Sequence, residues 1–276
     1  MSTSEKLLAT GGMGACSVMR ENRVKAALLG GEVQVGTWLH TLCAAELPQL
    51  LATSGFDYVN IDMEHSSFSV KAVGDLCFAA QQAGIVPLVR PPERQHHMMS
   101  RPVDNGALGI YAPHVDTVED AAGVVDAVKF GPLGHRGSQP PSINTSFNSF
   151  DAGDYMPRAN AETMIIVQLE SRIALENMDA ILALPGVDGA VIGRGDLAAD
   201  LGLGGQRSHP DIDRAVDDLV AACGRHGKIP GLMVLDLDDG AAWIGRGVRM
   251  VTYASEMLIL RNAGRAAVER LRNSAS

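Results

Sequence analysis

The chain has 276 residues and carries 23 lysine and arginine residues against 32 aspartate and glutamate residues, a formal net charge of −9 at pH 7. This acidic balance and the 4% share of aromatic residues argue against a nucleic-acid-binding protein, because phosphate contacts need a clustered basic surface and bases need aromatic platforms. The composition is that of a globular chain, and no apolar run reaches the length of about 18 residues that a membrane helix needs.

The first segment, residues 1–19, holds several Gly, Ser and Thr residues and lacks the apolar core of a signal peptide. We expect it to form a loose N-terminal arm, and we assign residues 20–276 to one domain. None of the four cysteines lies in a CxxC pair, so we expect reduced thiols in a soluble, cytoplasmic protein.

Short β-branched runs then alternate with longer amphipathic stretches, which predicts strands and helices in a parallel sheet. The predicted strands cover residues 33–40, 58–62, 85–90, 108–112, 164–169, 189–192, 229–234 and 250–254. The predicted helices cover residues 44–53, 69–82, 95–105, 117–130, 173–184, 211–226, 238–244 and 256–271. Ser69 and Thr117 are expected to cap two of these helices, Gly84 to end the helix that Ser69 caps, and Gly227 to end helix 211–226.

Eight strands alternating with eight helices are what a closed (β/α)₈ TIM barrel requires, in one domain of about 250 residues. An open doubly wound sheet is the competing fold. It usually carries a glycine-rich phosphate loop after its first strand, whereas Thr41, Leu42 and Cys43 stand there in this chain. The sequence therefore favours the barrel.

Residues 131–161 form a long polar segment between the fourth predicted helix and the fifth strand. Segments of this length are usually functional or disordered. In a barrel this connection lies at the face opposite the usual active site, and it could instead reach a neighbouring subunit.

Two carboxylates stand at the ends of consecutive strands, Glu170 after the fifth and Asp196 after the sixth. Neighbouring strands lie about 4.8 Å apart, so both side chains can reach one divalent ion such as Mg²⁺, Mn²⁺ or Co²⁺. The alternative is a pair of solvated or salt-bridged acids.

Arg90 ends the buried third strand, where a cation is costly unless it meets an anion. It could bind a carboxylate or an enolate oxygen, or form an internal ion pair with Glu64 or Glu170.

His65 follows Asp62 by three residues at the end of the second strand, and a carboxylate can fix a histidine tautomer and raise its basicity. The two can meet only if the strand ends near Asp62 and the chain turns. Otherwise His65 is structural or exposed. His114, which ends the fourth strand, could also line the site.

Several ordered segments together resemble the HpcH/HpaI aldolase family, the class II pyruvate-dependent aldolases that cleave 4-hydroxy-2-oxo acids. The resemblance runs from about residue 20 to 270 and rests on these segments: Ile61-Asp62-Met63-Glu64-His65, Pro87-Leu88-Val89-Arg90-Pro91, Gly134-His135-Arg136-Gly137, Val167-Gln168-Leu169-Glu170 and Ile192-Gly193 through Asp196. It implies a barrel of the phosphoenolpyruvate/pyruvate type, a last helix swapped between subunits, and a homohexamer built as a trimer of dimers.

The resemblance also implies the reaction and its partners. Glu170 and Asp196 would bind a divalent metal, and Arg90 would bind the oxygen of the ketone and of the enolate. His65, oriented by Asp62, would serve the acid/base step through a water. The products would be a 2-oxo acid such as pyruvate and an aldehyde, both small molecules.

For the carboxylate of the 2-oxo acid, the resemblance implies the amide N–H groups of Gly195 and Asp196, with Gln168 lining the site. None of the strand ends carries a lysine for a Schiff base. Arg194 and His114 depart from the common family pattern. Arg194 could add a cation at the pocket rim, or it could point away or pair with an acid.

A second function stays open because of these departures. A synthase of the same fold, like the citrate-forming members of the family, would add a pyruvate or oxaloacetate enolate to a carbonyl or acyl-CoA donor. A third interpretation is a non-enzymatic barrel that serves as an assembly partner or sensor, against which the retained acids, arginine and histidine argue.

Overall fold

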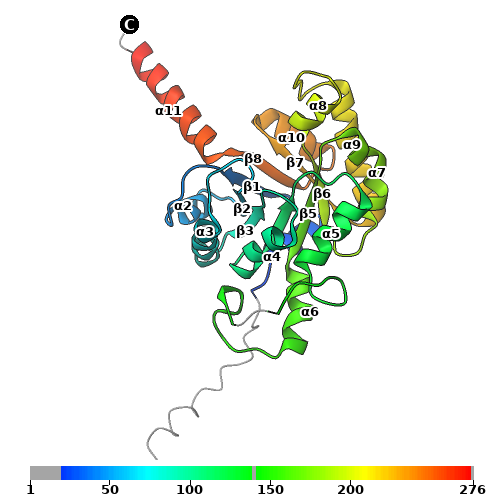
Figure 1. Cartoon of the computed structure of the whole chain (residues 1–276). Helices are drawn as coiled ribbons and strands as arrows, with labels where there is room; N and C mark the ends of the chain where they lie inside the picture. The colour runs from blue at the N-terminus through cyan, green and yellow to red at the C-terminus, as the bar shows by residue number, and fades with distance from the viewer. Residues whose placement is uncertain (1–19, 139–140, 275–276) are drawn as a thin grey trace, which may run out of the picture.

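The computed structural model describes residues 20–138 and 141–274, and these form a closed parallel barrel in which each strand pairs with the next and β8 pairs with β1 (Figure 1). The strands are β1 (Gln34–Leu39), β2 (Tyr58–Asp62), β3 (Val86–Arg90), β4 (Gly109–Ala112), β5 (Met164–Leu169), β6 (Gly189–Ile192), β7 (Ile229–Val234) and β8 (Met250–Ser255). The predicted (β/α)₈ barrel is confirmed. The predicted arm, residues 1–19, lies outside the described residues.

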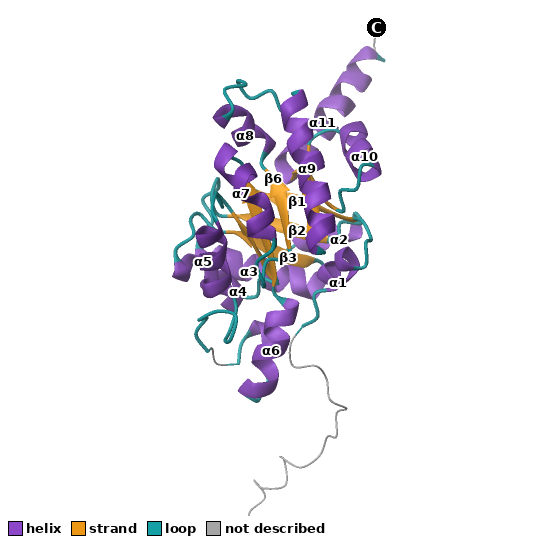
Figure 2. Cartoon of the chain, turned by 90° about the vertical axis from the view of Figure 1, so that its right-hand side faces the viewer, coloured by secondary structure: helices purple, strands orange, loops and turns teal. Residues whose placement is uncertain are grey.

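Helices surround the strands on the outside of the barrel, except α6 at one end and α11, which projects from the other (Figure 2). They are α1 (Arg23–Leu29), α2 (Leu47–Thr53), α3 (Val70–Ala83), α4 (His96–Asp104), α5 (Val118–Val128), α6 (Ala152–Glu162), α7 (Arg172–Leu182), α8 (Arg194–Asp200), α9 (Pro210–His226), α10 (Leu237–Gly245) and α11 (Glu256–Asn273). The predicted caps are present: Ser69 and Thr117 accept from backbone N–H groups, and Gly84 and Gly227 adopt the left-handed conformation.

Three helices were not predicted: α1, α6 and α8. The α6 segment contains Gly153, Pro157 and Asn160, which all disfavour helix, so the pattern resembles a loop. It begins where Asp151 caps the N–H groups of Gly153 and Asp154. With the short 3₁₀ helix Ile143–Thr145 it lies at the end of the barrel opposite α8 and α11, as predicted for residues 131–161 (Figure 1).

The barrel interior is filled by large side chains. The ring of Tyr58 occupies the space beside Gly36, where an added Cβ would lie 2.3 Å from it, and its hydroxyl lies 2.9 Å from Thr252 Oγ1. Above it, Trp38 packs edge-on against Tyr111 with their rings 5.0 Å apart. Beyond these buried aromatic side chains, a cavity opens at the carboxyl ends of the strands.

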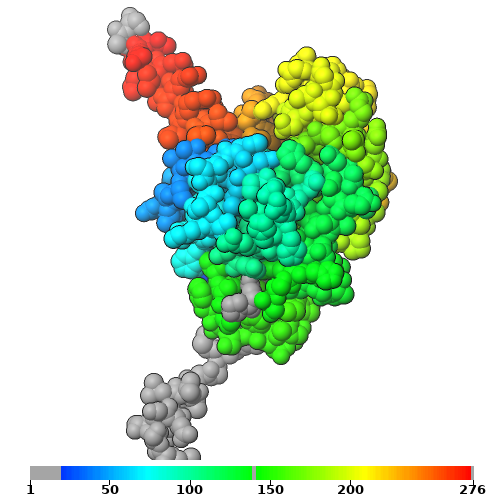
Figure 3. All heavy atoms as spheres, viewed as in Figure 1, coloured from blue at the N-terminus to red at the C-terminus, as the bar shows by residue number. Residues whose placement is uncertain are grey.

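The last helix, α11, projects away from the barrel (Figures 1 and 3). Its buried residue is Glu256, and apolar side chains along it are exposed, among them Leu260 and Leu271. No helix in the described part of the chain is both long and apolar enough to span a membrane. Of the cysteines in that part, Cys43, Cys77 and Cys223 are free thiols.

Candidate active site

A cavity of about 440 Å³ opens at the carboxyl ends of the strands, within the size range of small-molecule sites. Its lining combines aromatic, cationic and amide side chains with one acid: Trp38, His40, His65, Arg90, Tyr111, Gln168, Arg194, Asp196 and Arg207, with Met233, Leu235 and Met257 on one wall. The residues that line it come from strands far apart in the sequence, as in a barrel enzyme.

Asp62 and Arg90 end neighbouring strands and form a bidentate ion pair. Arg90 Nε lies 2.9 Å from Oδ1, and Nη2 lies 2.7 Å from Oδ2. Burial by itself would raise the pKa of Asp62, but hydrogen bonds from His40 and Arg90 outweigh it and hold that pKa well below its usual range. Asp62 is therefore an anion at any physiological pH.

Arg90 also contacts Glu64, whose Oε2 lies 3.1 Å from Nη1, and Gln168, whose Oε1 lies 3.5 Å from Nη1. A guanidinium has five N–H bonds; hydrogen bonds to Asp62 and Gln168 use three of them, and Glu64 adds an ion pair at Nη1. The second hydrogen on Nη2 has no acceptor among the described residues, so Arg90 keeps one donor for a ligand. Its position over Trp38, 4.4 Å from the ring centroid, fixes the plane of the guanidinium.

Gln168 connects Arg90 to Glu170, because its carbonyl accepts from Arg90 and its amide donates to Glu170 Oε2. Burial raises the pKa of the Glu170 carboxyl, and the charge of Asp196 raises it further, against the lowering effect of hydrogen bonds from Gln168 and His114. Glu170 is buried and Asp196 is exposed at the cavity, and a cation between them would relieve the repulsion of the two carboxylates.

Divalent ions fit this pair of carboxylates. Oxygen donors suit hard cations, which commonly take one or two carboxylates and fill their other positions with waters and substrate oxygens. The backbone of Gly193 lies against Glu170, where an added Cβ would stand 2.6 Å from Oε2. The chain therefore leaves room for Glu170 beside Asp196, although no group of three or more acidic, His or Cys ligands occurs among the described residues.

Replacing Gly193 by alanine is expected to weaken metal binding by about 10- to 100-fold, as disturbance of ligand-supporting groups typically does. The new methyl would overlap Glu170 Oε2 and lie 3.1 Å from Gln168 Nε2, so the carboxylate must move. Titration calorimetry with Mn²⁺ measures the effect. Gly123→Ala is the matched control, since a Cβ there meets nothing within 4 Å, and equal affinities in the two variants would contradict the prediction.

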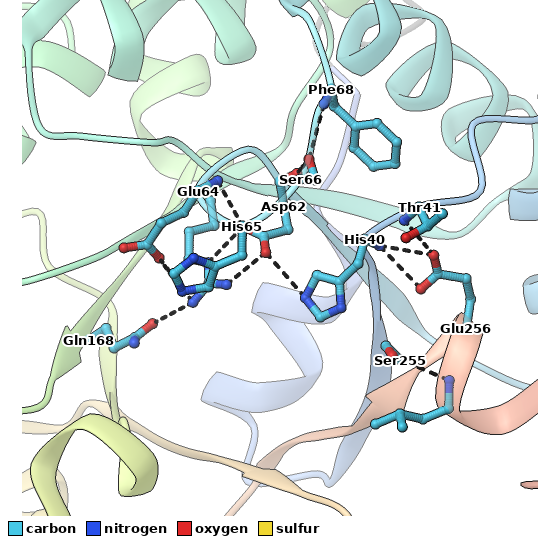
Figure 4. Close-up of polar contacts among 12 residues, drawn as sticks. His40, Thr41, Asp62, Glu64, His65, Ser66, Phe68, Gln168, Ser255 and Glu256 are labelled. Carbon is cyan, nitrogen blue, oxygen red and sulfur yellow. Dashed lines mark hydrogen bonds and ion pairs between the residues drawn. The ribbon is translucent and has the colours of Figure 1, made fainter. Parts of the chain in front are cut away.

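The predicted pairing of Asp62 with His65 is not present in the structure. Asp62 instead pairs with Arg90 and with His40, whose Nε2 lies 3.1 Å from Asp62 Oδ2 (Figure 4). The side chain of His65 is 66% exposed, and its nearest charged partner is Glu64 Oε2 at 3.8 Å. The chain does turn after Asp62, as the pairing required, but the turn carries His65 to the rim of the cavity.

His114 lies in the left-handed region, with φ of 52°, uncommon for a residue other than glycine. Its backbone N–H donates to Glu170 Oε1 over 3.0 Å, and its ring nitrogens lie 2.7 Å from Glu170 Oε1 and 2.8 Å from Glu64 Oε1. It bridges two acids at the edge of the site, close to where the sequence expected it.

Arg194 is buried and its charge is paired. Nη2 lies 2.7 Å from Asp239 Oδ2 and donates to the carbonyl of Met233 over 3.0 Å. Of the open alternatives, the structure selects the ion pair. A different arginine, Arg207, is exposed at the cavity, about 3.4 Å from where a Cβ of Gly195 would lie, and has no hydrogen-bond or ion-pair partner among the described residues.

The amide groups predicted to bind a carboxylate lie in the first turn of α8. The first N–H of the turn to be bonded along the backbone is that of Leu197, which donates to Gly193. The N–H groups of Gly195 and Asp196 have no acceptor among the described residues, and both residues line the cavity.

His40 and Arg207 were not predicted as site residues. His40 ends the first predicted strand, so the same strand-end argument that selected Asp62 and Arg90 would have selected it. Arg207 follows α8 in an irregular segment, and no periodicity or spacing places such a residue.

The HpcH/HpaI aldolase/citrate lyase family model matches residues 34–263. A hydroxypyruvate/pyruvate aldolase from Roseobacter denitrificans is 35% identical over 248 residues, covering 89% of this chain and 95% of that protein. A 2-keto-3-deoxy-L-rhamnonate aldolase from Klebsiella pneumoniae is 33% identical, covering 87% of this chain and 92% of that protein.

Solved structures agree. An HpcH/HpaI aldolase from Desulfitobacterium hafniense superposes with a TM-score of 0.86 at 30% identity, covering 90% of this chain and 96% of the other. The citrate synthase SbnG superposes with a TM-score of 0.82 at 25% identity, covering 91% and 98%. The two sequence relatives are aldolases, which are carbon–carbon lyases, and their match extends over nearly the whole barrel. The chain belongs to the HpcH/HpaI aldolase/citrate lyase family and is an enzyme of the aldolase type.

Proposed function

We propose that the protein is a divalent-metal-dependent aldolase that cleaves a 4-hydroxy-2-oxo acid to pyruvate, or a close 2-oxo acid, and an aldehyde. The observation that carries the proposal is the connected set Arg90, Gln168 and Glu170. It holds one free guanidinium N–H and a buried carboxylate beside the same cavity. That arrangement suits a reaction in which negative charge develops on a ketone oxygen.

In this proposal Glu170 and Asp196 hold the ion, which is Mg²⁺, Mn²⁺ or Co²⁺. When bound, a divalent ion supplies a Lewis acid for the 2-oxo group. The amide groups of Gly195 and Asp196 bind the carboxylate of the 2-oxo acid. Asp62 and Gln168 act as positioning residues, because they fix Arg90 from two sides.

Arg90 donates its free N–H to the oxygen on which the enolate charge forms as the C3–C4 bond breaks. His65, at the rim, takes the proton of the C4 hydroxyl through a water. Tyr111 and Trp38 form an apolar floor that keeps water from the carbanion side of the enolate.

The synthase alternative keeps one supporting observation. Arg207 at the cavity has no ion-pair partner in residues 20–138 and 141–274, and a substrate with a second anionic group would pair with it. The superposition on a citrate synthase is compatible with this alternative. A panel of aldehydes, oxo acids and acyl-CoA donors separates the two functions.

We also propose a cytoplasmic homohexamer, a trimer of dimers. The projecting α11, with Leu260 66% and Leu271 73% exposed, supports assembly because such side chains are seldom left in water along a whole helix. Light scattering that gives the mass of a single chain, 29.1 kDa, would contradict this assembly.

Exchange of the methyl protons of pyruvate with D₂O, followed by NMR, tests the proposed reaction without knowledge of the aldehyde. We expect exchange with added Mg²⁺, Mn²⁺ or Co²⁺ and its loss with EDTA, because the exchange passes through the enolate. No exchange with any of the three ions would count against a pyruvate aldolase and favour a larger oxo acid such as oxaloacetate.

A further inference from the structure

His40 follows β1 directly and lines the cavity beside Arg90 and Gln168. Its ring has one contact at its edge, with Asp62, and one on its face, with Trp38. Nε2 lies 3.1 Å from Asp62 Oδ2, and the ring stacks on Trp38 with 5.7 Å between centroids and 9° between planes. Only 21% of the side chain is exposed, and the contacts with Asp62 and Trp38 fix the orientation of the ring seen in the structure.

The backbone around His40 is held as firmly. The carboxylate of Glu256, buried at the start of α11, accepts from the N–H groups of His40 at 3.0 Å and Thr41 at 2.7 Å (Figure 4). It also accepts from the next N–H, that of Leu42, at 3.1 Å. Charge-assisted bonds of this kind are about twice as strong as neutral ones. Both the ring and the backbone of His40 are therefore fixed beside the cavity.

The contact with Asp62 also determines which ring nitrogen carries the hydrogen. An ionised carboxylate can only accept, so the hydrogen lies on Nε2 and the lone pair of a neutral ring lies on Nδ1. No described residue partners Nδ1. The charged groups near the ring are Asp62 from β2, Arg90 from β3 and Glu256 from α11, and of these Asp62 touches the ring directly.

His65 offers none of this. Its ring is exposed, the carboxylate paired with it is 3.8 Å away, and no aromatic ring in the described part of the chain stacks on it. An exposed histidine such as His65 can exchange protons with water beside the aldehyde. Proton transfer to or from C3 needs a ring held in a fixed orientation, which His65 lacks. The aldol reaction contains two proton transfers, one at the C4 oxygen and one at C3, and His40 and His65, which line the cavity, are in these two different situations.

We infer that His40, oriented by Asp62, is a further catalytic residue and transfers the proton at C3, while His65 serves the C4 hydroxyl. The inference rests on the proposed aldolase function. In the exchange direction, Nδ1 takes a proton from C3 of pyruvate. The C–H electron pair becomes the C2–C3 double bond, and the carbonyl electron pair moves to the oxygen beside Arg90.

In the cleavage direction the same steps run in reverse after the C3–C4 bond has broken. The imidazolium returns its proton to C3, which completes the methyl group of pyruvate, and water then reprotonates Nδ1. The proton that the C4 hydroxyl loses passes through His65 to water, so the overall proton count balances. Asp62 stabilises the imidazolium that forms on His40.

Oxaloacetate separates the C3 proton transfer from the rest of the chemistry. Loss of CO₂ from oxaloacetate gives the enolate of pyruvate without breaking a C–H bond, so the oxygen stabilisation by Arg90 is needed but a base at C3 is not. The experiment compares D₂O exchange into pyruvate with CO₂ release from oxaloacetate in wild type, His40→Gln, His65→Gln and His226→Gln. Glutamine at residue 40 keeps a donor for Asp62 and removes the base, and His226 is a surface histidine paired with Asp179.

We expect His40→Gln to lose about 100-fold or more of the exchange rate, the usual size of a general-base contribution, with little change in the KM for pyruvate. CO₂ release in a single turnover of oxaloacetate should stay close to the wild-type rate, because the protonation of C3 that His40 serves comes only after CO₂ has left. His65→Gln should keep exchange and lose aldol cleavage, and His226→Gln should match wild type in every assay. Circular dichroism confirms the fold of each variant.

Three results would overturn the inference. Exchange retained in His40→Gln and lost in His65→Gln would assign the C3 proton to His65. Exchange and decarboxylation falling together in His40→Gln would make His40 a positioning residue for Asp62 and Arg90. Wild type inactive in both assays with all three metals would overturn the proposed function itself, and this inference with it.

Discussion

Glu170→Gln is expected to lose metal-dependent pyruvate exchange by about 1,000-fold or more, because Lewis-acid stabilisation is worth several kcal/mol and an amide cannot hold the ion. Glutamine has nearly the same shape and can still accept from the His114 N–H, so the site should keep its geometry. Calorimetry with Mn²⁺ should detect no binding at concentrations that saturate wild type. Glu176→Gln, an exposed substitution on α7, is the control.

The same variant should not lose stability as the metal-free protein. A folded-state pKa raised by burial means that ionised Glu170 costs folding free energy, and this cost grows as the pH rises through that pKa. A glutamine at residue 170 is neutral at every pH and therefore lacks this free-energy cost. We therefore expect a Tm at neutral pH equal to or above that of metal-free wild type, and a rise in Tm with Mn²⁺ only in wild type. A large fall in Tm would mean that Glu170 is structural.

Arg90→Met is expected to lose both activity and stability. The lost hydrogen bond to the enolate oxygen should lower kcat by about 100- to 1,000-fold, as removal of one oxyanion donor does. Asp62 and Glu64 would remain buried without their cation, and breaking a buried ion pair costs about 3–5 kcal/mol. Denaturant unfolding and the exchange assay measure the two effects separately.

A double variant distinguishes the two losses. Asp62→Asn combined with Arg90→Met removes both charges of the bidentate pair, so it should recover part of the stability that Arg90→Met loses. It should recover none of the activity, because the donor at the enolate oxygen is still missing. Recovery of activity would show that Arg90 acts only by neutralising Asp62.

The fold was predictable because strand and helix periodicities differ, and each strand of this barrel is a short apolar run. The predicted and observed strand ends agree within about two residues, and Ser69 and Thr117 cap the helices predicted for them. The helix α6 was not predictable from local pattern. Its stability depends on tertiary contacts such as the packing of Tyr155 on Phe130, which the sequence does not display.

The site was predictable only as far as a strand end defines it. Arg90, Gln168 and Glu170 follow strands, and the structure brings them into one connected set. Which of these side chains form ion pairs with one another could not be predicted in the same way. Which of His40 and His65 meets Asp62 depends on where two separate loops turn, and Arg194 faces Asp239 because of the packing of α10 against β7. Partner choice between strand ends follows from three-dimensional register, not from spacing along the chain.

The position of Glu256 on the last helix matters for protein engineering. Its carboxylate belongs to α11 but binds the segment after β1, some 215 residues earlier in the sequence. Deleting α11 to obtain a smaller particle would therefore also release the strand end that carries His40. Polar replacements at Leu260 and Leu271 expose the same helix to water and leave Glu256 in place, so they separate quaternary structure from turnover where a truncation would mix the two.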